Sequence, residues 1–163
     1  MDSITRYLSP LGPLTLASDG TSLVGLWFEE QRYYAKSLMG EAEEKNLPIF
    51  EETKKWLDAY FAGMKPAERP PLEMRGTPFQ KQVWEILETI PYGTTMTYGE
   101  IAHQLVGKMN RPMSAQAVGG AVAHNPISII IPCHRVVGAN GHLTGYAGGL
   151  SRKEQLLALE RQQ

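Results

Sequence analysis

The sequence has little cysteine, no long apolar run and no acidic residue in a stretch of its second half. The single cysteine, Cys133, excludes an internal disulfide and a zinc site built from several cysteines, and it fits a reducing compartment. No apolar run approaches the ~20 residues that a membrane helix needs. Residues 1–6 also lack the basic start and apolar core of a secretory signal. We therefore expect a cytoplasmic protein that does not contact membranes.

The composition is that of a folded globular protein, with 42% hydrophobic and 20% charged residues in a chain of 163. This length suits one ordinary domain or two small ones. Residues 65–71 contain three prolines, which suit neither a helix nor a central strand. We predict the boundary there, with domains at 1–70 and 71–163.

The first domain is predicted to be an antiparallel sheet followed by a helix. Short β-prone runs at 5–8, 14–17 and 23–28 are separated by Pro/Gly and Asp-Gly turn signals, which favours a meander. Residues 29–48 have weak periodicity and are interpreted as loop with room for a short helix. Apolar residues at helical spacing predict a helix over 50–62, whose aromatic residues we assign to the core.

The second domain is predicted to be helical. Three capping boxes, at Thr77–Gln80, Thr97–Glu100 and Ser151–Glu154, mark helix starts. A further helix over 114–124 is rich in Gly and Ala and is stopped by Asn125-Pro126. The helices after Thr97 and Ser114 resemble a helix-turn-helix that enters a DNA groove, although a plain helical hairpin has the same pattern. The fold class is thus α/β in the α+β sense.

The charge distribution marks this second domain as locally basic. No Asp or Glu occurs between residues 101 and 153. The same stretch holds five cations and all four histidines: Lys108, Arg111, Arg135, Arg152, Lys153, His103, His124, His134 and His142. The pattern is consistent with an ordinary solvated face or with a surface that binds a polyanion.

Cys133 is the first candidate for chemistry. It follows the apolar run Ile129–Ile131 and a proline, and it precedes His134 and Arg135. Nearby cationic groups lower the pKa of a thiol and so favour the nucleophilic thiolate; the alternative is a buried structural cysteine. Adjacent residues in an extended segment point to opposite sides, so a direct Cys–His contact needs a turn, and otherwise a water must bridge them.

Residues 138–149 contain five glycines and are predicted to form a loop that walls a pocket. The loop lacks the spacing and the lysine of a P-loop. Tyr146 within it either faces a ligand or anchors the loop to the core.

Several of these motifs together resemble the O6-alkylguanine-DNA alkyltransferase family. They are Asn125-Pro126, Pro132–Val136, the Gly145-Tyr146 and Gly148-Gly149 loop, and the helix from Lys153 to Glu160. The resemblance is specific over roughly residues 76 to 160 and looser before them. It implies a ribonuclease H-like first domain and a winged-helix-like second domain.

The resemblance also implies the activity. Such a protein flips O6-alkylguanine out of double-stranded DNA, bound through the minor groove, and passes the alkyl group irreversibly to its cysteine. It uses no cofactor and no metal, and we expect it to act as a monomer.

By the resemblance, Cys133 is the acceptor, His134 the base that acts through a bridging water, and Glu160 the residue that orients the imidazole. Asn125 matches the hinge to the active-site segment, Tyr98 the residue that helps to rotate the nucleotide phosphate, and Tyr146 a wall of the guanine pocket. The remaining predicted contacts to DNA or substrate are Gln116, Gly119, Arg111 and Arg135.

Gln116 departs from the family pattern, which usually has an arginine inserted where the flipped base was. Glutamine can fill the gap but lacks charge and stacking surface. The preceding residues 106–113, interpreted as a loop, would bring Lys108 and Arg111 to the DNA face and offset that loss.

Two other functions fit parts of the sequence. One is a module of the same fold that binds alkylated DNA without transfer, but such relatives typically have tryptophan where this chain has Cys133. The other is a Cys–His hydrolase, for which the sequence shows neither a distant histidine in a suitable motif nor an oxyanion hole.

Overall fold

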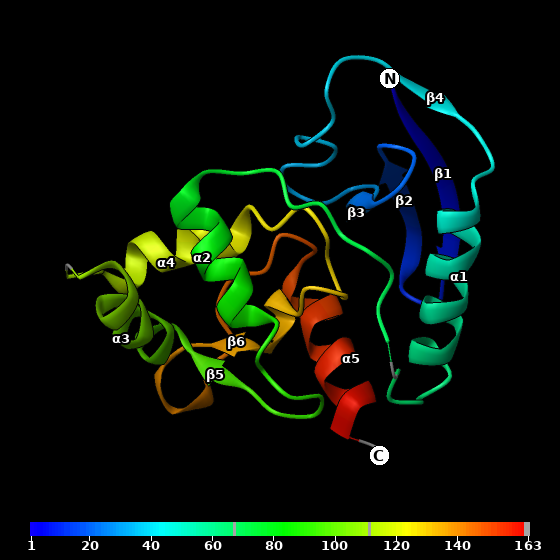
Figure 1. Cartoon of the computed structure of the whole chain (residues 1–163). Helices are drawn as coiled ribbons and strands as arrows, with labels where there is room; N and C mark the ends of the chain where they lie inside the picture. The colour runs from blue at the N-terminus through cyan, green and yellow to red at the C-terminus, as the bar shows by residue number, and fades with distance from the viewer. Residues whose placement is uncertain (67, 111, 162–163) are drawn as a thin grey trace.

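The computed structural model describes residues 1–66, 68–110 and 112–161. The chain begins with the strands β1 (Asp2–Ser9), β2 (Gly12–Ser18) and β3 (Leu23–Phe28), which form the predicted antiparallel meander (Figure 1). The fourth strand, β4 (Ala42–Glu44), pairs in parallel with β1, so the sheet order is β3-β2-β1-β4. The interpretation of residues 29–48 as loop was therefore wrong for β4, because three residues are too few to show a strand period.

Helix α1 (Pro48–Phe61) follows the sheet and confirms the helix predicted over 50–62. A proline at its first turn suits the helix start, where the missing N–H has no partner to lose. Its buried residues include Phe50, Leu57 and Tyr60, which join the core.

The second half is mostly helical, as predicted. Its elements are α2 (Pro78–Leu87), β5 (Met96–Thr97), α3 (Tyr98–Met109), α4 (Ala115–Ala123), a 3₁₀ turn (Cys133–Arg135), β6 (Val136–Val137), a second 3₁₀ turn (Ala139–Gly141) and α5 (Leu150–Arg161). The capping boxes at Thr77 and Thr97 are both formed, and Ser114 caps α4. Strands β5 and β6 pair in parallel.

Two boundaries differ from prediction. The Ser151–Glu154 capping box is wrong, because α5 begins at Leu150 and the N–H of Lys153 already bonds to the carbonyl of Gly149 at 3.1 Å. The predicted loop 106–113 is helical as far as Met109, where Asn110 ends α3 in the left-handed conformation at φ 53°.

Strand β3 connects the two halves of the chain. Its free edge pairs with the proline-rich connection, through Leu23 N to Pro71 O at 2.8 Å, and with the segment after α4, through Leu26 N to Pro126 O at 2.9 Å. One apolar core continues from the sheet into α2, α3 and α4. The segment that leads to Cys133 is thereby fixed against the sheet.

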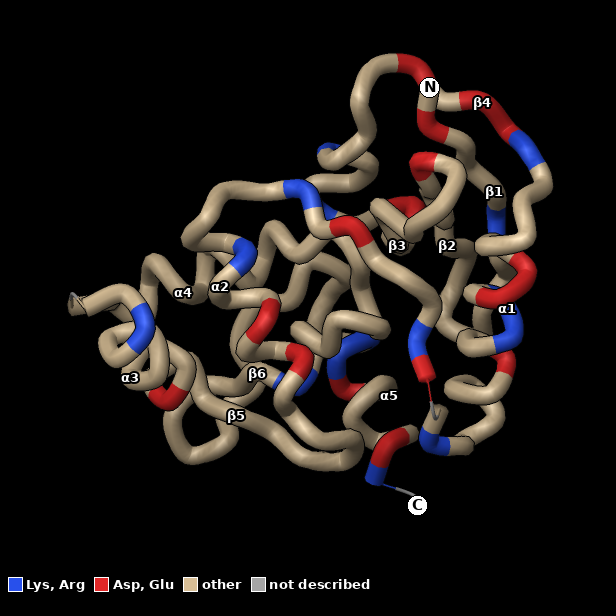
Figure 2. Tube along the Cα trace, viewed as in Figure 1, with Lys and Arg blue, Asp and Glu red and all other residues tan. Residues whose placement is uncertain are grey.

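Charge is unevenly distributed over the fold. Figure 2 shows acidic residues along β4 and α1, whereas α4 carries no charged residue. Within the described ranges, no helix is long and apolar enough to cross a membrane.

Candidate active site at Cys133

Cys133 begins a 3₁₀ turn and is buried, with 5% of its surface exposed. The segment before it is held by Asn125, whose Nδ2 donates to Ile131 O at 2.8 Å and whose Oδ1 accepts from Ile127 N at 3.0 Å. Ile129 lies between these two bonds with φ 70°, a strained conformation for a β-branched residue. The end of α4 is therefore coupled through Asn125 to the position of the thiol.

The expected low pKa of Cys133 is wrong. Burial raises the pKa of the thiol above its usual value, and the Asn125 amide, the Lys153 charge and Tyr146 only partly oppose this effect. The cations adjacent in sequence do not supply the expected stabilisation, because His134 and Arg135 turn toward Glu160. Cys133 therefore needs a base to take its proton.

Lys153 is a site residue that the sequence interpretation missed. It is buried in α5, and its Nζ donates to Thr144 O at 3.4 Å and Gly145 O at 3.3 Å. Burial lowers the pKa of Lys153 and the charge of Cys133 raises it. Lys153 thus fixes the glycine-rich loop and places a cation near the thiol.

His134 and Glu160 form a fully buried pair. His134 Nε2 lies 2.6 Å from Glu160 Oε2, and the side chains of both have no exposed surface. His134 Nδ1 has no hydrogen-bond partner among the described residues. Burial lowers the pKa of His134 despite the carboxylate. The imidazole is thus neutral near pH 7, with Nε2–H donating to Glu160 and the lone pair on Nδ1.

Glu160 is ionised although it is buried. Burial alone would raise its pKa, but the hydrogen bond from His134 and the charge that His134 carries when protonated, followed by the hydrogen bonds and charge of Arg135, hold the pKa well below its ordinary value. Arg135 Nε donates to Oε1 at 2.8 Å and Nη2 donates to Oε2 at 3.1 Å. Gly93 N adds a further bond to Oε1 at 3.1 Å.

Arg135, predicted to contact DNA or substrate, is therefore placed on Glu160 and on Ile90 O, which its Nη1 reaches at 2.8 Å. The Glu160 carboxylate is buried and negatively charged, and it attracts the Arg135 guanidinium toward the protein interior. Arg152 is also engaged within the protein, donating to Leu11 O at 3.0 Å. Three of the five cations of the basic stretch, counting Lys153, point into the fold.

Tyr60 is the second missed residue. Its hydroxyl donates to Glu160 Oε2 at 2.7 Å and lies 3.4 Å from His134 Nε2. The assignment of the α1 aromatics to the core holds for the Tyr60 ring, but the hydroxyl belongs to the site. Nothing in the periodicity of α1 distinguishes it from its neighbours.

Beside the thiol lies a cavity of about 720 Å³. Tyr98, Gln116, Gly119 and Tyr146 line it, together with Arg32 and residues 144–147. Burial raises the pKa of Tyr98 and Tyr146, and the charge of Cys133 raises both pKa values further. The thiol therefore lies close to the cavity wall that these two tyrosines form. The structure thus brings together four predicted substrate contacts; Arg111 lies outside the described residues.

The described residues contain no group of three or more His, Cys, Asp or Glu side chains placed to hold a metal ion. The site offers instead a nucleophile, a neutral base and an ionised carboxylate next to a cavity that is open to solvent. This set suits transfer of an electrophilic group to sulfur.

Comparison with known proteins gives the same result for both halves of the chain. Residues 4–73 match the ribonuclease-like domain of 6-O-methylguanine DNA methyltransferase, and residues 78–162 match its DNA-binding domain. A methylated-DNA–protein-cysteine methyltransferase from Mycobacterium tuberculosis is 48% identical, over 94% of this chain and 88% of the relative. One from Haemophilus influenzae is 42% identical, over 96% and 85%.

The structure is similar to that of Mycobacterium tuberculosis OGT in complex with DNA, with a TM-score of 0.85 and 44% identity. That alignment covers 98% of this chain and 93% of the other. The two domain matches, together with identity over nearly the whole chain, show that the protein belongs to the 6-O-methylguanine DNA methyltransferase family.

Proposed function

We propose that the protein repairs DNA by transferring the alkyl group of O6-alkylguanine to Sγ of Cys133. The observation that carries the proposal is the position of Cys133, which lies near the cavity-lining residues Tyr98 and Tyr146 and shares its 3₁₀ turn with His134, the partner of Glu160. The family membership supports the same activity. A binding module without transfer is not favoured, since nucleophile and base are both present.

The chemistry follows from the protonation states. His134 Nδ1 takes the thiol proton through a bridging water, and Glu160 stabilises the imidazolium that results. The sulfur attacks the alkyl carbon, the S–C bond forms as the C–O6 bond breaks, and the electron pair stays on the guanine oxygen. The proton that His134 took from the thiol then neutralises the departing guanine and leaves the imidazole neutral again. The product is a thioether that neither His134 nor Glu160 can reverse. The reaction needs no cofactor or metal, because cysteine supplies the electron pair.

DNA binding places the lesion base at this thiol. We infer that α4 enters the minor groove, since its uncharged, small-residue surface permits close approach. A Cβ on Gly119 would lie 3.8 Å from the Tyr98 ring, so a larger side chain there would narrow the cavity mouth. Gln116 occupies the space of the flipped base, and Asn125 couples α4 to the active-site segment.

The protein is proposed to act as a monomer in the cytoplasm, with structural units at residues 1–70 and 71–163. The family matches over 4–73 and 78–162 support that division. The continuous core and the pairing along β3 support a fixed arrangement of the two units.

The proposal is tested by intact-protein mass spectrometry after incubation with a duplex that contains O6-methylguanine. We expect a gain of one methyl group per protein molecule and no second turnover. A protein molecule that removed methyl groups repeatedly, or gained none, would contradict the proposal.

Gln116→Arg is expected to speed repair of a duplex lesion about tenfold. Unpairing a base costs a few kcal/mol, and an inserted guanidinium adds stacking and phosphate attraction that glutamine lacks. Single-turnover rates with methylated duplex measure the effect, and rates with free O6-methylguanine, which needs no flipping, serve as the control. Equal acceleration of both reactions would mean that residue 116 does not act in flipping.

A further inference from the structure

Tyr60 comes from the N-terminal half of the chain, yet its hydroxyl lies inside the His134–Glu160 pair. Its donor bond of 2.7 Å ends on Oε2, the same carboxylate oxygen that His134 Nε2 approaches at 2.6 Å. The two donors are themselves 3.4 Å apart. Oε2 thus accepts from the imidazole and the phenol, and more distantly from Arg135 Nη2 at 3.1 Å, while Oε1 accepts from Arg135 Nε and Gly93 N.

The phenol can act here only as a donor. Tyr60 has no exposed surface, and burial and the charge of Glu160 raise its pKa far above the ordinary value. A neutral phenol beside an ionised carboxylate donates its proton to it. The bond therefore persists at any pH at which Glu160 is ionised.

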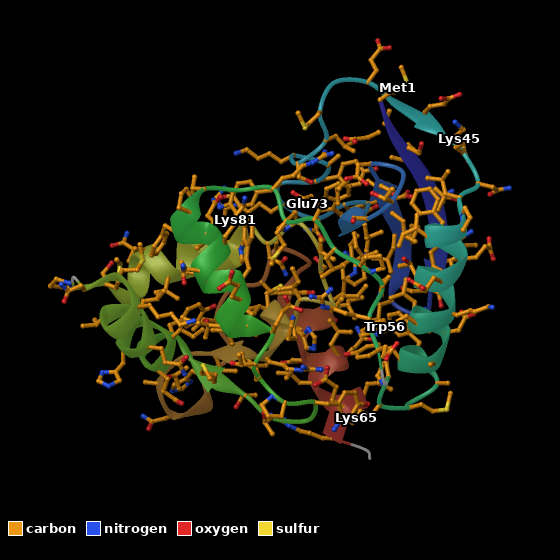
Figure 3. All side chains as sticks on the ribbon, in the orientation of Figure 1. Met1, Lys45, Trp56, Lys65, Glu73 and Lys81 are labelled. Atoms are coloured by element: carbon orange, nitrogen blue, oxygen red, sulfur yellow. The ribbon has the colours of Figure 1, made fainter. Side chains whose placement is uncertain are left out.

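The ring of Tyr60 is fixed by its neighbours. Trp56, one turn earlier in α1 and labelled in Figure 3, stacks on it with the centroids 5.5 Å apart and the planes at 7°. Phe61, Tyr92 and His134 contact it edge-on. A ring held on several sides keeps its hydroxyl in one place, which is what a group that orients a carboxylate requires.

We infer that Tyr60 is a positioning residue for alkyl transfer, which holds Oε2 of Glu160 on the Nε2–H of His134 and so keeps Nδ1 directed at the thiol. This inference rests on the proposed function. The hydroxyl withdraws part of the negative charge of Oε2, so that the proton on Nε2 stays with the imidazole. The other charges that act on His134 are Glu160, Arg135 and Lys153.

The test is Tyr60→Phe, which keeps the ring and removes only the hydroxyl. The single-turnover rate with methylated duplex is expected to fall about tenfold, because a hydrogen bond to a charged group is lost. Without that donor the carboxylate holds more negative charge and stabilises the imidazolium. The pKa of His134 should therefore rise, and the acid limb of the pH–rate profile should move up by about one pH unit for a tenfold change in proton affinity.

Tyr7→Phe is the matched control. The Tyr7 hydroxyl also donates to a carboxylate, Asp58 Oδ1 at 2.6 Å, and Asp58 lies in the same helix as Tyr60. This variant loses the same kind of phenol–carboxylate bond at an exposed position away from the site. Its transfer rate and pH profile should equal those of the unsubstituted protein.

NMR titration of the His134 ring separates this inference from the proposed function, because it measures the pair without alkyl transfer. In the unsubstituted protein we also expect a slowly exchanging Tyr60 hydroxyl proton with a nuclear Overhauser contact to the His134 ring, a measurement that needs no variant. A Tyr60→Phe protein with an unchanged His134 pKa and acid limb, or the absence of that hydroxyl proton, would reduce Tyr60 to a core residue. If methyl transfer by the unsubstituted protein fails, the proposed function falls and with it the role of Tyr60 in alkyl transfer, while the NMR titration still decides whether the Tyr60 hydroxyl sets the pKa of His134.

Discussion

Cys133→Ala is expected to gain no mass from methylated duplex at any protein excess or incubation time. Cys133 is the only cysteine, and the base His134 has no other thiol to deprotonate. Alanine removes a single sulfur atom from a buried site and leaves the bonds of Asn125 to Ile131 and Ile127 intact, so the fold should persist. Intact-mass spectrometry measures the loss directly.

The same variant should still bind the duplex, because the DNA contacts proposed above lie on α3, α4 and the cavity wall and do not include the sulfur. Fluorescence anisotropy with labelled duplex provides this control. Binding without mass gain separates recognition from chemistry. Methylation of Cys133→Ala at another residue would move the acceptor away from position 133.

Glu160→Gln has the second largest expected effect, on rate and stability together. The amide carries no charge to stabilise imidazolium, so single-turnover transfer should slow by about a hundredfold, as expected when a general base is impaired. It also leaves the mostly buried Arg135 without a counter-charge. Breaking a buried pair costs about 3–5 kcal/mol, which for a domain of this size lowers the thermal unfolding midpoint by roughly 10 °C.

The matched control is Glu88→Gln, which removes a carboxylate that Arg69 contacts at 2.6 Å on the surface. Exposed pairs of this kind contribute about 0–1 kcal/mol, so unfolding and transfer should barely change. Equal effects of both substitutions would show that burial of Glu160 is not what matters.

The sign of the pH dependence follows from Glu160. The pKa of Glu160 is lower in the folded protein than in the unfolded chain, where a glutamate has a pKa of about 4.3. The stability that Glu160 contributes is therefore fully present above pH ~4.3 and is lost as the pH falls through the pKa of the folded protein. Denaturant titrations below that pH should show a steeper loss of stability for the unsubstituted protein than for Glu160→Gln.

Local signals in the sequence predicted most of the elements. The capping boxes at Thr77 and Thr97 placed two helix starts, and Asn125-Pro126 placed the end of α4, because each depends on a few neighbouring residues. Ser151 failed for the same kind of reason. Its box competes with Gly149, whose carbonyl already accepts a helical bond.

The sequence predicted only those site residues that belong to a recognisable motif or to the family resemblance. The sequence did not predict Tyr60 or Lys153 as site residues, because the role of each depends on partners elsewhere in the chain. Tyr60 acts on Glu160, and Lys153 acts on the carbonyls of residues 144 and 145 and on Cys133. The pKa of Cys133 was misjudged because sequence neighbours were taken as spatial neighbours. Burial of the thiol decides that its pKa is raised, and the three residues Cys133, His134 and Arg135 do not reveal by themselves that the thiol is buried.

The lack of charge on α4 has a consequence for how rare lesions are found. Only Gln116 on this helix has a side chain with strong hydrogen-bonding groups, so α4, placed in the groove as proposed above, would have little means of distinguishing one undamaged base pair from the next. A protein held mainly by phosphate contacts can slide and hop along DNA. Where the binding energy changes little from one undamaged base pair to the next, the protein dissociates quickly from each one. It then spends most of the search for a lesion moving along the DNA.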